Sequence, residues 1–206
     1  MVVQASQVAS RRDRRERHIL DIAARLFREQ GYASTTTRDI SAAAGINSAT
    51  PNYYFGTKAA ILFRIYEETF DALEGQLDSV EMLPPYDALV TIIRAGVVET
   101  ATHPDYVAVF FQEFRWLDRH LEPNMSRALR GREAGFIRRI RGLVEDGARA
   151  GVFRPVDPQA AAAHLIGVAA WTYQWYRPGR AEGPEIIAER CVDLAFHGLL
   201  DAHPAK

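Results

Sequence analysis

The sequence is poor in the residues that covalent or metal-based scaffolds need. It contains one cysteine, Cys191, in 206 residues. A single cysteine excludes an internal disulfide framework and favours a reducing compartment. The apolar residues around Cys191 indicate a core position on a helix. The six histidines are widely scattered, and none is paired with another at the four-residue spacing of a helical metal site. We therefore expect no metal and no cofactor.

Long apolar runs are also missing. No stretch approaches the roughly 20 apolar residues of a membrane span. The first ten residues, MVVQASQVAS, lack the apolar core of a signal peptide. We therefore expect a cytoplasmic protein without membrane contact. The chain has neither a glycine-rich phosphate loop nor a nucleophile elbow. Catalytic groups need not be close in sequence, but nothing here indicates an enzyme.

Charge is unevenly distributed along the chain, although the net charge is only −1. Residues 1–64 hold ten Lys or Arg and five Asp or Glu, a net charge of +5, whereas the remainder carries −6. Such asymmetry predicts a polyanionic partner for the first part only. A solvated, arginine-rich leader would give the same imbalance.

No strand-like alternation is present, and apolar residues instead recur at spacings of three and four, which predicts an all-α protein of about nine helices. We expect a disordered leader at residues 1–12, with the first helix from about Arg12 to Gln30. A small three-helix domain follows at 13–56, and a larger helical domain for ligand binding and dimerisation at 57–206. A helix over 57–79 starts beside the small domain and continues beyond it.

The most informative stretch is TTRDISAAAGINSATPNYYFGTK, residues 36–58. Thr36 can cap a short helix with Asp39 as its capping-box partner. Gly45 can end that helix, because glycine adopts the left-handed backbone found just past helix ends. Asn47 and Ser48 are candidate caps for a second short helix ending near residue 54, and Pro51 favours Ser48, because proline is tolerated in a first turn.

Two short helices around a glycine turn form a helix-turn-helix, in which the second helix reads the DNA major groove. Spacing alone is equally typical of an ordinary helix corner. Residues 18–64, however, resemble the DNA-binding domain of the TetR family of bacterial repressors. The residues that carry the resemblance are Ile22-Ala23, Leu26-Phe27, Gly31-Tyr32, Thr35-Thr36-Thr37-Arg38-Asp39-Ile40, Ala44-Gly45-Ile46 and Asn52-Tyr53-Tyr54-Phe55-Gly56-Thr57-Lys58.

The resemblance implies a set of DNA contacts. Thr36 and Thr37 would meet a backbone phosphate at a helix N-terminus, and Lys58 would hold another. Arg38 would reach a base edge or a phosphate. The residues expected to face the groove are Ser48, Thr50, Asn52, Tyr53 and Tyr54. Tyr54 stands where the family commonly has histidine, and Pro51 leaves the pose of Asn52 open.

The second half resembles the subgroup of the family that senses acyl-coenzyme A thioesters, through FFQEFRWL (110–117), GVFRPVDP (151–158) and WTYQWYRPGR (171–180). The expected ligand-binding residues are aromatic or cationic: Phe110, Phe111, Phe114, Arg115, Trp116, Trp171, Trp175 and Arg177. Arginines, including Arg180, would pair with nucleotide phosphates. An aromatic core or interface with solvated arginines explains the same residues.

The resemblance implies a homodimer formed by the last two helices, whose small residues permit close packing: Ala162, Ala163, Gly167, Ala170, Leu194 and Gly198. We expect a ligand-responsive repressor that binds a pseudo-palindromic DNA operator as a dimer. A small hydrophobic effector, such as an acyl-coenzyme A thioester, would shift the helix over 57–79 and release the DNA. The alternatives are a hydrophobic drug sensor that controls efflux and a DNA-binding regulator without a ligand.

Overall fold

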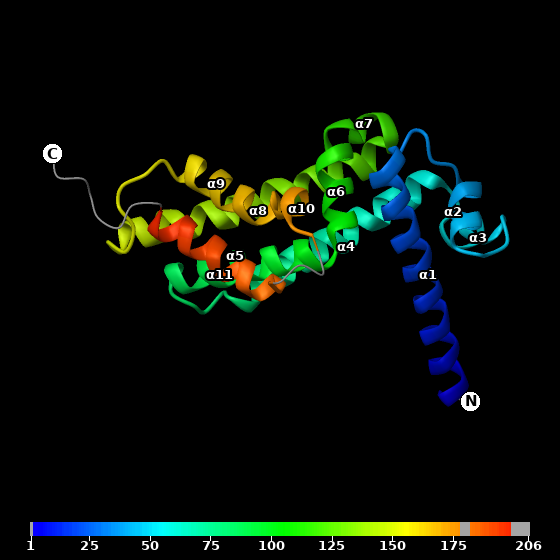
Figure 1. Ribbon diagram of the computed structural model, residues 1–206, viewed down its shortest axis with the longest axis horizontal. Helices are drawn as coiled ribbons and strands as arrows, with labels where there is room; N and C mark the ends of the chain where they lie inside the picture. Colours follow the sequence, from blue (N-terminus) through cyan, green and yellow to red (C-terminus); the bar gives the residue numbers. More distant parts are fainter. Residues whose placement is uncertain (1, 178–181, 199–206) are drawn as a thin grey trace. The chain divides into compact units, whose positions relative to one another are not determined.

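The computed structural model describes residues 2–177 and 182–198, and this part of the chain is helical throughout, without a strand. The helices, shown in Figure 1, are α1 (Val2–Gln30), α2 (Thr37–Ala43), α3 (Thr50–Phe55), α4 (Lys58–Ser79), α5 (Pro85–Thr102), α6 (Pro104–Glu113), the 3-10 helix η1 (Phe114–Trp116), α7 (Leu117–His120), α8 (Pro123–Arg149), α9 (Pro158–Ala170), α10 (Thr172–Trp175) and α11 (Pro184–His197). If α6 to α7 count as one interrupted helix and α9 with α10 as another, nine helical segments result. The predicted all-α class is confirmed.

Helix α1 differs most from the expectation. It begins at Val2 rather than near Arg12, so the segment expected to be a disordered leader is helical. Residues 1–30 contain neither glycine nor proline, and they are rich in alanine, glutamine and arginine, which are good helix formers. No residue before Gly31 therefore stops the helix. Gly31 does so by adopting a positive φ of 84°.

The chain divides into two compact units, and the division does not follow the expected boundary at residue 57. The first unit comprises residues 1–69 and 105–129, and the second comprises 70–104 and 130–206. The segment 105–129 thus belongs with the basic N-terminal part, because Val109, Phe114 and Leu117 are buried in that unit. The core of the first unit also contains Phe27 and Tyr66.

In the second unit, α5 packs against α9 and α11, as Figure 1 shows. A continuous core of buried side chains joins these helices to α8 and to the end of α4, with Leu89, Ile93, Ile140 and Leu165 among its members. Cys191 belongs to this core, as predicted.

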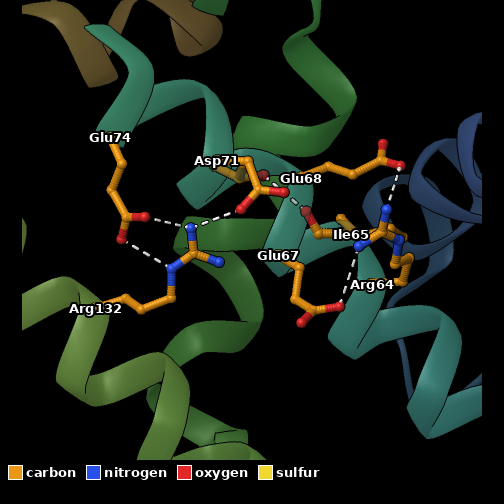
Figure 2. A network of polar contacts seen from close by, with 8 residues as sticks. Arg64, Ile65, Glu67, Glu68, Asp71, Glu74 and Arg132 are labelled. Atoms are coloured by element: carbon orange, nitrogen blue, oxygen red, sulfur yellow. Dashed lines mark hydrogen bonds and ion pairs between the residues drawn. The ribbon is translucent and has the colours of Figure 1, made fainter. Parts of the chain in front are cut away.

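Hydrogen-bonded ion pairs between charged side chains connect helix α8 to the C-terminal part of α4 (Figure 2). Arg132 donates two hydrogen bonds to Glu74, at 2.8 and 2.6 Å, and one to Asp71 at 2.7 Å. Its guanidinium also lies 5.3 Å from the centre of the Phe70 ring. Further along the same two helices, Arg139 of α8 donates a hydrogen bond to Asp78 of α4 at 2.7 Å. The bidentate pair of Arg132 with Glu74 is geometrically specific, so it fixes the register of α8 on this part of α4.

The described residues contain no helix that is both long and apolar enough to cross a bilayer. In the same part of the chain, no group of three or more His, Cys, Asp or Glu is placed to hold a metal ion.

Candidate nucleic-acid interface

The N-terminus of α2 has the predicted capping box. The Thr36 hydroxyl accepts the Asp39 N–H at 3.2 Å and donates to the Asp39 carboxylate at 2.7 Å. The Asp39 carboxylate in turn accepts the Thr36 N–H at 2.8 Å. These hydrogen bonds from Thr36 hold the pKa of the Asp39 carboxyl below its ordinary value. The box satisfies the Thr36 and Asp39 N–H groups, so the Thr37 and Arg38 amides are the first-turn N–H groups of α2 without an intrahelical acceptor.

The turn after α2 contains Gly45 with a φ of 64°, as predicted, but the cap of α3 differs from the prediction. The N-cap is Ala49, which makes no side-chain capping bond, rather than Ser48. The Asn47 side chain instead accepts the Ala49 N–H at 2.9 Å. Asparagine commonly hydrogen-bonds the backbone two residues on, which shapes the turn itself and moves the helix start forward. Pro51 then occupies the first turn of α3 and is buried.

Most of the residues expected to face DNA are accessible. Arg38, Ser48 and Asn52 are exposed, and Tyr53 is 78% exposed. Thr37, Thr50 and Tyr54 are half-buried. Ile40, in contrast, is fully buried and fixes α2 on the core. The surface of α2 and α3 therefore combines short hydroxyl and amide side chains with an exposed aromatic ring.

Helix α1 adds the positively charged side chain of Arg12 to this surface. The Arg12 guanidinium lies 5.8 Å from the centre of the Tyr54 ring, and Tyr54 in turn makes an edge contact with Tyr53. Arg12 also donates to Glu16 at 2.8 Å. A helical α1, rather than a disordered leader, places this positive charge beside α3.

Lys58 occupies a different environment from the one expected for a phosphate contact. Its Nζ donates to the backbone oxygens of Tyr32 and Thr35, each at 2.7 Å, and lies 4.2 Å from the centre of the Tyr32 ring. Burial lowers the pKa of the ammonium, and the Glu113 and Asp39 carboxylates oppose that shift. Two of its three N–H donors therefore hold the turn between α1 and α2.

Side chains of α6 and α7 also contact this turn, and the sequence did not predict these contacts. Glu113 accepts the Tyr32 backbone N–H at 3.1 Å with one carboxylate oxygen. Its other oxygen lies 3.1 Å from His120 Nε2. The His120 ring packs against the Tyr32 ring with the centroids 4.5 Å apart. Burial and the Glu113 carboxylate together raise the pKa of the Tyr32 phenol.

Comparison with known proteins accounts for both parts of the chain. Residues 19–65 match the family model of bacterial regulatory proteins of the tetR family, and residues 82–199 match the model of the tetracyclin repressor-like C-terminal domain. The chain belongs to the TetR family. It is 32% identical to the transcriptional repressor KstR2 of Rhodococcus jostii over 199 residues, which cover 92% of this chain and 93% of that protein.

Solved structures of the TetR family agree with this assignment. The regulator PfmR from Thermus thermophilus superposes with a TM-score of 0.77 at 26% identity, covering 88% of this chain and 98% of PfmR. AibR, solved in complex with isovaleryl coenzyme A and operator DNA, superposes with a TM-score of 0.75 at 26% identity, covering 87% and 97%.

The residues expected to bind a ligand fall into two groups, one in each compact unit. Phe110 and Phe114 stack at 4.6 Å in the first unit, and each makes an edge contact with Tyr66. Phe111 lies against Phe110 and is 42% exposed. The Trp116 ring is flanked by the guanidinium groups of Arg115 and Arg119, at 4.6 and 4.4 Å.

The second group contains Trp171, Trp175 and Arg177, which are exposed in the second unit. The Arg177 side chain donates to the Tyr176 backbone oxygen at 2.9 Å. Arg180 lies outside the described residues.

Four of the residues expected at a dimer interface are exposed in the single chain, namely Ala163, Gly167, Leu194 and Gly198, and Ala170 is half-buried. Ala162 is fully buried in the chain's own core, so its assignment to the interface was wrong. The three-to-four-residue period of α9 places Ala162 and Ala163 on different faces, and the sequence alone did not show which face the core occupies.

Proposed function

We propose that this TetR-family chain is a transcriptional repressor that binds a pseudo-palindromic operator as a homodimer and is released by a small hydrophobic effector. The observation that carries the proposal is the capped helix-turn-helix, whose α2 and α3 present Arg38, Asn52 and Tyr53 to solvent. In such motifs the second helix enters the major groove and short polar side chains contact base edges. The related proteins named as repressors support the same function.

The direct DNA contacts that we propose are phosphate contacts near Thr37 and base contacts from α3. Thr37 supports the first because its amide begins α2, where the helix dipole favours an anion. Tyr53 and Asn52 support the second because both are exposed on α3. Arg12 contributes positive charge from α1 beside Tyr54.

An acyl-coenzyme A thioester is the effector class that we propose. AibR, which has the same fold, binds isovaleryl coenzyme A together with operator DNA. The stacked cluster of Phe110 and Phe114, with Phe111 exposed beside it, offers aromatic surface for an acyl group. Effector binding would shift α4 and change the spacing of the two recognition helices, provided that the effector prefers the conformation that cannot bind DNA.

The homodimer is proposed to form through α9, α10 and α11. Trp171 and Trp175 are 60% and 49% exposed, and Ile186 and Leu194 are 49% and 50% exposed. Exposed large apolar side chains of this number mark an interaction surface. Trp171 and Trp175 directly follow α9, which carries the exposed Gly167, and Ile186 and Leu194 lie on α11. We therefore assign Trp171 and Trp175 to the proposed dimer surface rather than to the effector site.

The function is tested with the full chain and the promoter fragment upstream of its own gene, against random-sequence competitor at moderate salt. We expect a clear preference for the promoter fragment, and we expect isovaleryl coenzyme A, but not free coenzyme A, to release it. Tyr53→Ala is expected to reduce the preference without changing the unfolding temperature.

Equal binding to promoter and competitor would contradict the proposal. Release by hydrophobic drugs alone would instead favour a drug sensor, and the absence of release by any compound would favour a regulator without a ligand.

A further inference from the structure

The turn between α1 and the helix-turn-helix is held by groups that come from two distant parts of the chain. Tyr32 is at the centre of these contacts. Its N–H donates to Glu113, its backbone oxygen accepts from Lys58, and its ring contacts both the Lys58 ammonium and the His120 ring. Thr35, three residues later, accepts the second hydrogen bond from Lys58.

Glu113 can hold this turn firmly because its own helix is anchored. At the start of α6, Asp105 pairs with Arg28 at 2.6 Å, and the Tyr106 hydroxyl donates to Asp21 at 3.0 Å. Further along α6, the buried Tyr66 hydroxyl donates to the Val109 backbone oxygen. All these residues belong to one compact unit.

Each oxygen of the Glu113 carboxylate also has a partner, and the side chain is largely shielded from water. Its side chain is 13% exposed and that of its partner His120 is 16% exposed. One oxygen holds the Tyr32 N–H while the other is held by the His120 ring, so the carboxylate has little freedom to turn away. Hydrogen bonds to an ionised group that is sheltered from water are among the stronger ones in proteins.

We propose that Glu113 is a positioning residue for operator binding. It fixes the turn that leads into the helix-turn-helix from the α6 side, while Lys58 closes the same turn from α4. Lys58 thus acts through the backbone oxygens of Tyr32 and Thr35 rather than mainly through a DNA phosphate. This proposal rests on the DNA-binding function proposed above, and it assigns part of the operator affinity to two residues that need not touch DNA.

The test compares operator affinity and its salt dependence for the full chain carrying Glu113→Ala, Glu113→Gln or Lys58→Met. Glu122→Ala is the matched control, because Glu122 is an exposed carboxylate nine positions later in the same unit. We expect Glu113→Ala to weaken binding about tenfold, the size of one charge-assisted hydrogen bond. Glu113→Gln keeps an acceptor for the Tyr32 N–H and is expected to recover about half of that loss on a logarithmic scale.

The salt dependence separates positioning from simple instability. A smaller folded fraction would reduce the apparent affinity equally at every salt concentration and leave the slope unchanged. A displaced helix-turn-helix loses phosphate contacts, so Glu113→Ala is expected to flatten the slope of log affinity against log salt by about one. Lys58→Met is expected to give a loss of the same size as Glu113→Ala, and the double variant is expected to lose less than the sum, because both residues hold one turn.

Amide hydrogen exchange tests the contact without DNA. We expect faster exchange of the Tyr32 amide in Glu113→Ala and unchanged exchange in Glu122→Ala. Wild-type binding to the promoter fragment combined with equal affinities for Glu113→Ala and Glu122→Ala would overturn the positioning role alone. A wild type without promoter preference would overturn the proposed function, and the positioning role would fall with it.

Discussion

At the scale of single residues, the ionised Asp39 carboxylate stabilises the N-terminus of α2 by accepting hydrogen bonds. It accepts hydrogen bonds from the Thr36 N–H and hydroxyl, and they lower its pKa in the folded state. A carboxyl with a lowered folded pKa stabilises the protein above its unfolded pKa, roughly 3.9 for aspartate. That contribution is lost as the pH falls through the folded pKa.

We therefore expect Asp39→Asn to unfold at a lower temperature than the wild type at neutral pH, and the difference to disappear towards pH 3 and below. Thermal unfolding followed by circular dichroism over this range checks the prediction. A difference that stays constant with pH would show that the charge of Asp39 does not contribute to the cap.

At the scale of elements, the end of α8 depends on a glycine that leaves room for an aromatic ring. A Cβ on Gly147 would overlap the Phe153 ring, which folds back over the helix end. The Val152 and Phe153 N–H groups both donate to the Gly147 backbone oxygen, at 2.9 and 3.1 Å, so the loop cannot move away easily. Gly142, on the same helix, has nothing within 4 Å of a built Cβ.

We expect Gly147→Ala to lower the free energy of unfolding by about 1–3 kcal/mol through overpacking. The matched variant Gly142→Ala is expected to raise it by about 0.5–1 kcal/mol, because alanine is the better helix former and meets no neighbour. Denaturant unfolding of the two variants measures both values. Equal effects of the two substitutions would contradict the packing described for Phe153.

The interrupted helix around Phe114 is a second feature at this scale. The aromatic segment 105–121 is interrupted at η1, between α6 and α7. The break lets Glu113 and His120, seven residues apart, meet through their side chains. It also buries Phe114 and Leu117 in the first unit.

At the scale of the whole molecule, the assembly proposed here depends on the exposed face of α9 and α11. Leu194 is 50% exposed, so replacing it leaves the core of the chain intact. In a two-fold dimer each such change acts twice. A buried carboxylate without a partner costs at least about 2 kcal/mol.

We expect Leu194→Asp to be monomeric at micromolar concentration, as measured by light scattering after size-exclusion chromatography, and to lose cooperative operator binding. Met82→Asp is the control. Met82 is 93% exposed and lies in the connection between α4 and α5, so it belongs to neither α9 nor α11. A dimeric Leu194→Asp would place the interface elsewhere.

Local sequence was sufficient to predict the short helices around Gly45 and most of the helix ends, whereas the resemblance to the TetR family identified these helices as a helix-turn-helix. Thr36 with Asp39, Gly31, Gly45 and Thr57 act within three or four residues, so their effects follow from backbone geometry alone. The same reasoning predicted an all-α chain, because the three-to-four-residue period of apolar residues depends only on the order of residues.

Tertiary structure alone decided what those elements contact. The Glu113 carboxylate and the Tyr32 amide meet across 81 positions, and the Lys58 ammonium reaches Tyr32 across 26, so no local pattern could indicate either partner. Packing likewise turned Ala162 inward and left Ala163 and Leu194 exposed. The residue types determined which helices form, whereas burial and long-range hydrogen bonds determined which side chains remain exposed at the surface.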